Sequence, residues 1–136
     1  MGREVVSRSA EETVALGREV GAGLSAGAVL LLEGDLGAGK TTFVKGVALA
    51  CGVDTQVRSP TFALMHRYRG DPDVVHIDLY RESDPAALED LDFESWGDDV
   101  VTVVEWPRHL ASYLWPEAVR IRFEHVDPET RRLLLP

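Results

Sequence analysis

The sequence predicts an α/β fold of three layers, with a mostly parallel central sheet and antiparallel additions. Short apolar runs at 28–33 and 100–104 are typical of strands buried on both faces of a parallel sheet. The first run leads through a glycine-rich stretch into a segment of helical periodicity, the strand–loop–helix order of α/β proteins. At 136 residues, the chain is long enough for one domain with a sizeable core.

The composition is that of a folded globular protein, with 45% hydrophobic and 27% charged residues. No apolar run approaches the ~20 residues of a membrane span, and the N-terminus lacks the apolar core of a signal peptide. The single cysteine, Cys51, falls on an apolar helix face, so we expect it to be buried and inert in a reducing cytoplasm. A net charge of −9 argues against direct, tight binding to DNA or RNA and leaves a basic protein partner possible.

The N-terminal segment is expected to form a short strand over residues 4–8, followed by a helix that begins at Ser9. Ser9 and Glu12 have the spacing of a capping box, in which each side chain accepts a hydrogen bond from a free N–H group. Helical periodicity predicts a buried face formed by Thr13, Leu16, Gly17, Val20 and Leu24. Three glycines are expected to loosen the helix end and lead into the strand at 28–33: Gly21, Gly23 and Gly27.

The glycine-rich stretch from Gly34 to Thr42 matches the phosphate-binding Walker A pattern, G-x-x-x-x-G-K-[ST]. Its glycines allow successive backbone N–H groups to surround an anion. Lys40 can reach the β- and γ-phosphates, and the Thr41 hydroxyl can ligate Mg²⁺. A helix starting near Lys40 would add the positive end of its dipole, and its predicted buried face comprises Val44, Val47, Ala48 and Cys51. The pattern therefore predicts a nucleoside triphosphate site on a P-loop NTPase-like fold.

Gly52 is expected to end this helix, and a polar connection leads to Ser59 and Pro60. Pro60 cannot donate a hydrogen bond to a sheet, so it indicates the entry to a strand expected over residues 62–69. Thr61 has two interpretations that the residues alone do not separate. It is either an ordinary residue at the start of a strand or a switch element that senses the γ-phosphate.

A turn at residues 70–73 precedes a strand expected over 74–80, whose alternation places His76 and Asp78 on one face. Asp78 ends an apolar strand, where P-loop proteins carry an acidic group that orients water or helps to hold Mg²⁺. A lone histidine such as His76 is more often a structural residue with a satisfied hydrogen bond. Residues 81–94 are rich in acidic side chains, which form either a solvated face or a docking surface on short helical turns.

The apolar run at 100–104 ends at Glu105, Trp106 and Pro107. A carboxylate at the end of a buried strand is unfavourable unless a partner offsets its charge, and ligands bind at this edge of α/β sheets. Glu105 is therefore a candidate Mg²⁺ ligand, directly or through water. Trp106 belongs either to the core or to a lid beside the phosphates. Further on, alternation predicts a strand over 118–123, a turn at 127–130 and a hairpin partner over 131–135.

Four motifs in this order resemble the TsaE (YjeE) family of bacterial P-loop ATPases, which act in the synthesis of threonylcarbamoyladenosine in tRNA. They are Gly-Asp-Leu-Gly-Ala-Gly-Lys-Thr-Thr at 34–42, Ser-Pro-Thr-Phe at 59–62, His-Ile-Asp-Leu-Tyr-Arg at 76–81 and Val-Glu-Trp-Pro at 104–107. The resemblance covers most of the chain and becomes loose beyond Trp115.

The resemblance implies a role for each matching residue. The phosphates would be held by Leu36, Gly37, Ala38, Gly39, Lys40, Thr41 and Thr42. Thr41 and Glu105 would hold Mg²⁺, and Asp78 with Lys40 would act in hydrolysis. Thr61 and Trp106 would respond to the nucleotide. Ala10 and Thr13 would lie near the base, although they match the family by spacing and not by a signature.

The resemblance also implies a slow, partner-dependent ATPase that works with TsaB and TsaD. TsaD carries out the transfer onto the tRNA adenosine beside the anticodon, so this chain would meet tRNA only indirectly. Two other functions stay open. One is a small-molecule kinase, although no segment resembles an acceptor lid, and the other is a nucleotide-gated binding module that needs no hydrolysis. A GTPase is disfavoured because the chain lacks an Asn-Lys-x-Asp guanine-recognition element.

Overall fold

The computed structural model describes residues 2–34, 39–54, 57, 65–79, 91–106 and 115–135. Its strands are β1 (Arg3–Ser7), β2 (Val29–Gly34), β3 (Met65–Tyr68), β4 (Asp73–Asp78), β5 (Val100–Glu105), β6 (Val119–His125) and β7 (Arg131–Leu135). Its helices are α1 (Ala10–Ala22), α2 (Lys40–Ala50), the short α4 (Phe93–Trp96) and the 3₁₀ turn η1 (Gly97–Asp99). Within these ranges no helix is long and apolar enough to cross a membrane.

The strands form one mixed sheet in the order β1-β7-β6-β2-β5-β4-β3. The four inner strands β6, β2, β5 and β4 are parallel to their neighbours. At the edges, β3 is antiparallel to β4, β7 is antiparallel to β6, and β1 is antiparallel to β7. The predicted α/β fold, with a mostly parallel sheet and antiparallel additions, is therefore confirmed.

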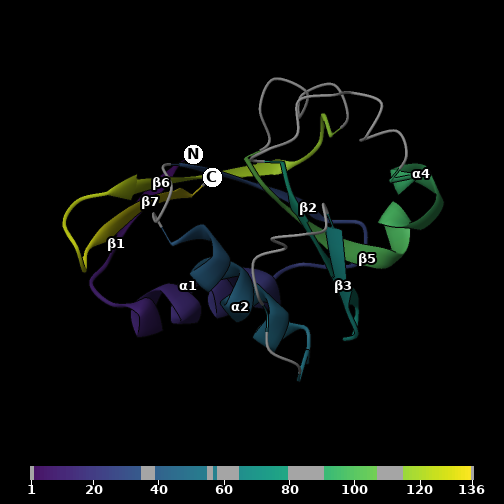
Figure 1. Cartoon of the computed structure of the whole chain (residues 1–136), viewed down its shortest axis with the longest axis horizontal. Coiled ribbons are helices and arrows are strands. Elements are labelled where there is room, and N and C mark those ends of the chain that lie inside the picture. The colour runs from purple at the N-terminus through teal and green to yellow at the C-terminus, as the bar shows by residue number, and fades with distance from the viewer. Residues whose placement is uncertain are drawn as a thin grey trace.

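The sheet is buried on both faces around β2. Helices α1 and α2 lie side by side on one face (Figure 1), where Leu30 and Leu32 pack with Phe43 of α2. On the opposite face Leu31 belongs to a second cluster, which includes Trp115 and the α4 residue Phe93. All three leucines are fully buried, because successive side chains of a strand alternate between its faces and both faces of β2 are covered. This explains why β2 reads as a continuous apolar run.

Helix α1 begins as the capping box predicts. The Ser9 side chain accepts a hydrogen bond from the Glu12 N–H at 3.0 Å. The Glu12 carboxylate accepts from the N–H of Arg8, one residue earlier than a standard capping box uses. Thr13 and Gly17 are buried as expected, and the other predicted residues of this face pack against the core.

The prediction that Gly21 loosens the end of this helix is wrong. Gly21 lies inside α1 and is buried, and the helix ends one residue later with Gly23 as its C-cap. The reason is the close approach of the two helices. A Cβ atom would lie 2.1 Å from the Phe43 carbonyl oxygen at Gly17, and 2.9 Å from the Val47 Cα at Gly21. At Gly46 of α2, a Cβ atom would lie 2.0 Å from the Val14 carbonyl oxygen.

The remaining strand boundaries follow the sequence predictions to within a few residues. Strand β4 begins one residue earlier than expected and ends at Asp78, and β6 extends to His125. The predicted hairpin is present, because β6 and β7 pair across a turn in which the Asp127 carboxylate accepts from the Glu129 and Thr130 N–H groups. The strand predicted over 62–69 is present as β3 at Met65–Tyr68; Arg69 follows the strand, and residues 62–64 lie outside the described ranges. Most of the acidic segment at 81–94 also lies outside them.

Candidate functional site

Three parallel strands and one helix bring the predicted site residues together. Strand β2 ends at Gly34, β4 at Asp78 and β5 at Glu105, while α2 begins at Lys40. Glu105 is the register partner of Leu32 on one side and of Asp78 on the other. The carboxyl ends of parallel strands lie at one edge of the sheet, which is where ligands bind in open α/β folds.

Two glycines with positive φ bound the phosphate-binding motif. Gly34 has a φ of +145°, and a Cβ atom there would lie 2.4 Å from the Phe123 carbonyl oxygen. Gly39 has a φ of +95° and is the N-cap of α2, without a side-chain hydrogen bond to the helix. The first turn of α2 also has no acidic residue, so within this turn no carboxylate competes for the N–H groups and positive dipole of the helix terminus. Three predicted phosphate-loop residues lie outside the described ranges: Leu36, Gly37 and Ala38.

Lys40 is buried, with 4% of its surface exposed. Its Nζ atom donates a hydrogen bond to the Gly34 carbonyl oxygen at 2.7 Å and lies 3.1 Å from the centroid of the Trp106 ring. Trp106 has a φ of 57°, a left-handed conformation that is unfavourable for a bulky residue and is often found at functional sites. The start of α2 and the end of β2 therefore hold the Lys40 ammonium group beside Gly34, the first glycine of the motif.

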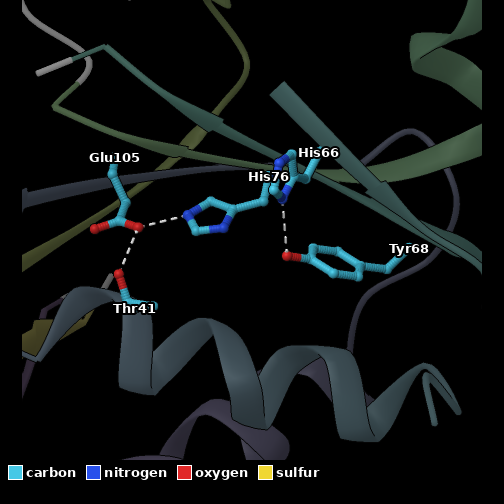
Figure 2. Close-up of polar contacts among 5 residues, drawn as sticks. All are labelled: Thr41, His66, Tyr68, His76 and Glu105. Carbon is cyan, nitrogen blue, oxygen red and sulfur yellow. Dashed lines mark hydrogen bonds and ion pairs between the residues drawn. The ribbon is translucent and has the colours of Figure 1, made fainter. Parts of the chain in front are cut away.

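Thr41 and Glu105 are linked directly, although 64 positions separate them in the chain. The Thr41 hydroxyl donates to Glu105 Oε2 at 2.9 Å, and the same oxygen lies 2.5 Å from His76 Nε2 (Figure 2). Glu105 is 3% exposed and His76 is fully buried. The two predicted metal ligands are thus in contact, and a histidine accompanies them.

Asp78 lies beside Glu105 at the end of the neighbouring strand. Residues at the same register position of adjacent parallel strands point to the same face, with backbones about 4.8 Å apart. Asp78 is half-buried at the C-terminal end of β4. Asp78 and Glu105 therefore share one face of the sheet, and Glu105 contacts Thr41 in the first turn of α2.

The start of α1 lies against the other end of the phosphate-binding motif. A Cβ atom at Gly39 would lie 3.7 Å from Thr13 Cγ2 and 3.8 Å from Arg131 Cγ. Thr13 is buried, and its hydroxyl is 2.7 Å from the Ser7 hydroxyl. Ala10 is exposed, in the first turn of the same helix. Sequence reasoning missed Arg131, which begins β7 and pairs with Ser7 across the sheet, because no local pattern connects residue 131 with the motif.

Two further predicted site residues are Thr42 and Thr61. Thr42 is half-buried in the first turn of α2. Thr61 lies outside the described ranges, so its two interpretations stay as they were.

The donor set fits Mg²⁺ bound together with a nucleotide. Among the described residues, no three His, Cys, Asp or Glu side chains form a group that could hold a metal by themselves. Mg²⁺ seldom requires one, since it is usually bound by one or two carboxylates, water and the substrate's phosphates. Thr41 and Glu105 supply oxygen ligands, and the N-terminus of α2 with Lys40 supplies groups that attract phosphate.

Comparisons with known proteins identify the family. The model of the family described as "Threonylcarbamoyl adenosine biosynthesis protein TsaE" matches residues 7–133, well past Trp115. The chain is 41% identical over 133 residues to the tRNA threonylcarbamoyladenosine biosynthesis protein TsaE of Mycobacterium bovis, covering 90% of this chain and 79% of the relative. It is 43% identical over 114 residues to the protein of that name from Treponema pallidum, covering 80% and 82% respectively.

A solved structure agrees with this result. The crystal structure of Bacillus subtilis YdiB superposes with a TM-score of 0.78 at 31% sequence identity, over 99% of this chain and 84% of that one. The sequence motifs and the site residues described above all lie within residues 7–133, which the family model matches. The chain therefore belongs to the TsaE family, whose members take part in the threonylcarbamoyladenosine modification of tRNA.

Proposed function

We propose that this chain is an ATP-binding subunit with weak Mg²⁺-dependent ATPase activity. It supports threonylcarbamoyl transfer to the tRNA adenosine beside the anticodon by acting on a cytoplasmic TsaB–TsaD complex. The observation that carries this proposal is the buried Lys40 ammonium at the N-terminus of α2, next to the linked Thr41 and Glu105 side chains.

Phosphate binding uses the residues at the start of α2. Lys40 and the N–H groups of the first helical turn attract the β- and γ-phosphates, together with the loop residues between Gly34 and Gly39. The nucleoside end of the ligand then lies towards Thr13 and Arg131, which flank Gly39 on the side of α1 and β7. Trp106 lies over Lys40, so a nucleotide that draws the ammonium group away changes the surroundings of the indole ring.

Thr41 and Glu105 would hold Mg²⁺, which when bound offsets the charge of the phosphates. Asp78 would orient a water molecule for attack on the γ-phosphate and accept its proton, and its register position beside Glu105 supports this role. Rapid phosphoryl transfer normally also uses an arginine that stabilises charge in the transition state. Arg131 lies near Gly39, but its guanidinium donates to the Asp127 and Thr130 carbonyl oxygens and not to the site. The partner complex would therefore supply the positive charge that completes the site at the γ-phosphate.

The test measures nucleotide affinity of the chain, and phosphate release from Mg²⁺–ATP by the chain alone and with a TsaB–TsaD complex, in wild type and two lysine variants. Lys40→Ala should weaken nucleotide binding about 10-fold to 100-fold, because hydrogen bonds to charged groups contribute roughly 1.5–3 kcal/mol. Lys45→Ala is the matched control, because Lys45 is exposed on the same helix. Release should be slow alone and rise with the partners.

Other outcomes point to the alternatives. Tight ATP binding without a rise in release, together with full tRNA modification by a binding-competent Asp78→Asn variant, would establish a nucleotide-gated binding module. Transfer of the γ-phosphate to a nucleoside or sugar would establish a kinase. Equal nucleotide affinity in Lys40→Ala and wild type would contradict the site itself.

A further inference from the structure

His76 is a buried polar residue whose hydrogen bond, among the described residues, is to Glu105. It lies within β4 on the face that points towards α2, and none of its surface is exposed. A carboxylate only accepts hydrogen bonds, so His76 donates through Nε2 to Glu105 Oε2. In the part of the chain that the structure describes, its other ring nitrogen, Nδ1, is buried without a hydrogen-bond partner.

A histidine at this position of β4 lowers the stability of the folded state. A buried nitrogen without a partner destabilises the folded state, and a β-branched apolar residue would pack in a parallel strand without that cost. The neighbours of His76 in β4 are such residues, Val74, Val75 and Ile77, and all are buried. The contact with Glu105 therefore offers a reason for a histidine at this position.

The two oxygens of the Glu105 carboxylate differ in their hydrogen bonds. Oε2 receives both the Thr41 hydroxyl and His76 Nε2, whereas Oε1 points away from both groups (Figure 2). In the described ranges no hydrogen bond reaches Oε1. A glutamate has three rotatable bonds, and two donors on one oxygen restrict all of them.

We propose that His76 is a positioning residue for the metal site: it holds Oε2 of Glu105 and thereby presents Oε1 to the divalent cation that accompanies the nucleotide. This inference rests on the proposed function, because it assumes that a cation–nucleotide complex binds beside Thr41. Partners that orient metal ligands in this way typically change metal affinity 10-fold to 100-fold when they are removed.

Two substitutions separate positioning from packing. The amide nitrogen of His76→Gln reaches close to the place of Nε2, whereas that of His76→Asn lies near Nδ1 and falls short of Glu105. Both remove the ring, so both disturb packing. His66→Asn is the matched control, because His66 pairs with His76 in the register of β3 and β4 and its described hydrogen bond is to Tyr68.

The experiment uses the full chain with ADP and Mn²⁺, and follows Mn²⁺ binding by electron paramagnetic resonance, which needs no turnover. We expect His76→Asn to weaken Mn²⁺ binding about 10-fold to 100-fold, and His76→Gln to restore most of that loss. Affinity for ADP without metal should stay as in wild type in both variants, and His66→Asn should bind Mn²⁺ normally. Thermal unfolding of each variant reports its folding.

Four results would overturn the inference. Wild-type Mn²⁺ affinity in His76→Asn, or equal losses in the Asn and Gln variants, would show that the histidine does not act through Nε2. If ADP binds to wild type but Mn²⁺ does not bind with it, the proposed metal site fails and the inference fails with it. If the variants do not fold, nitrogen NMR of the wild-type imidazole decides: the Nε2–H tautomer supports the inference and the Nδ1–H tautomer overturns it.

Discussion

The contact between α1 and α2 leads to a sharp prediction for Gly46→Ala. A Cβ atom at Gly46 would lie 2.0 Å from the Val14 carbonyl oxygen and 2.6 Å from the Arg18 nitrogen. Both are backbone atoms of α1, so no side-chain rotation can relieve the overlap. The helices must move apart by about 1 Å, which loosens the packing of both against the sheet.

Two opposing effects decide the magnitude. Alanine in a helix interior is favoured over glycine by up to about 1 kcal/mol. Overpacking costs about 1–3 kcal/mol, and we take about 3 kcal/mol because the clash is with backbone. The net loss is about 2 kcal/mol in the free energy of unfolding, or about 6 °C in the melting temperature of a domain this size.

The assay is urea unfolding of Gly46→Ala and Gly23→Ala with and without ADP. Gly23 is the C-cap of α1, where a Cβ atom would lie 3.6 Å from the Val20 carbonyl oxygen, an ordinary contact. Its substitution should leave stability within about 0.5 kcal/mol of wild type. Because Lys40 and Thr41 begin α2, Gly46→Ala should also weaken ADP binding, whereas Gly23→Ala should not.

A double variant adds an internal check. Gly17→Ala introduces a clash with the Phe43 carbonyl oxygen in the same interface. Once the helices have separated for one methyl group, the second costs less, so the combined loss should be smaller than the sum of the two. Unfolding free energies of Gly46→Ala equal to or above those of wild type would refute the close approach of the helices.

Two further predictions concern titratable groups outside the site. The Gly70 N–H and then the Arg67 side chain lower the pKa of Asp73, so this carboxylate stabilises the fold above its unfolded-state pKa, and that contribution is lost as pH falls through the lower folded-state value. Asp73→Asn should therefore unfold at lower urea concentration than wild type at pH 7 and show a smaller difference near pH 3; equal pH dependence of the two urea midpoints would contradict this. Burial, and to a lesser degree the Asp71 carboxylate, raises the pKa of the Cys51 thiol, so a thiol reagent at pH 8 should label the native chain far more slowly than the urea-unfolded chain, and equal rates would show that Cys51 is accessible.

Features that depend on neighbours in the chain were predictable from the sequence. The Ser9 cap, the strand at 29–34, the helix beginning at Lys40 and the hairpin turn at 127–130 follow from spacing, periodicity and turn chemistry. So does the expectation that Asp78 and Glu105 end buried strands. Each of these signals acts over fewer than about ten residues, because capping, alternation and turn formation are local interactions.

The site itself depends on the order of the strands. Neither the place of β5 between β2 and β4 nor the pairing of β1 with β7 leaves a local pattern. The pairing of β5 with β4 brings Glu105 beside Asp78. The pairing of β7 with β1 accompanies the approach of Arg131 to Gly39.

Local patterns accordingly establish which residue types can bind phosphate, hold a cation and begin each helix in this protein. The tertiary structure decides which of these groups meet. It joins Thr41 to Glu105, aims His76 at the same carboxylate and buries Gly21 between two helices. The physical reason is that strand register and helix packing minimise the free energy of the whole core, so contacts between distant residues arise from the fold and not from any single stretch of the chain.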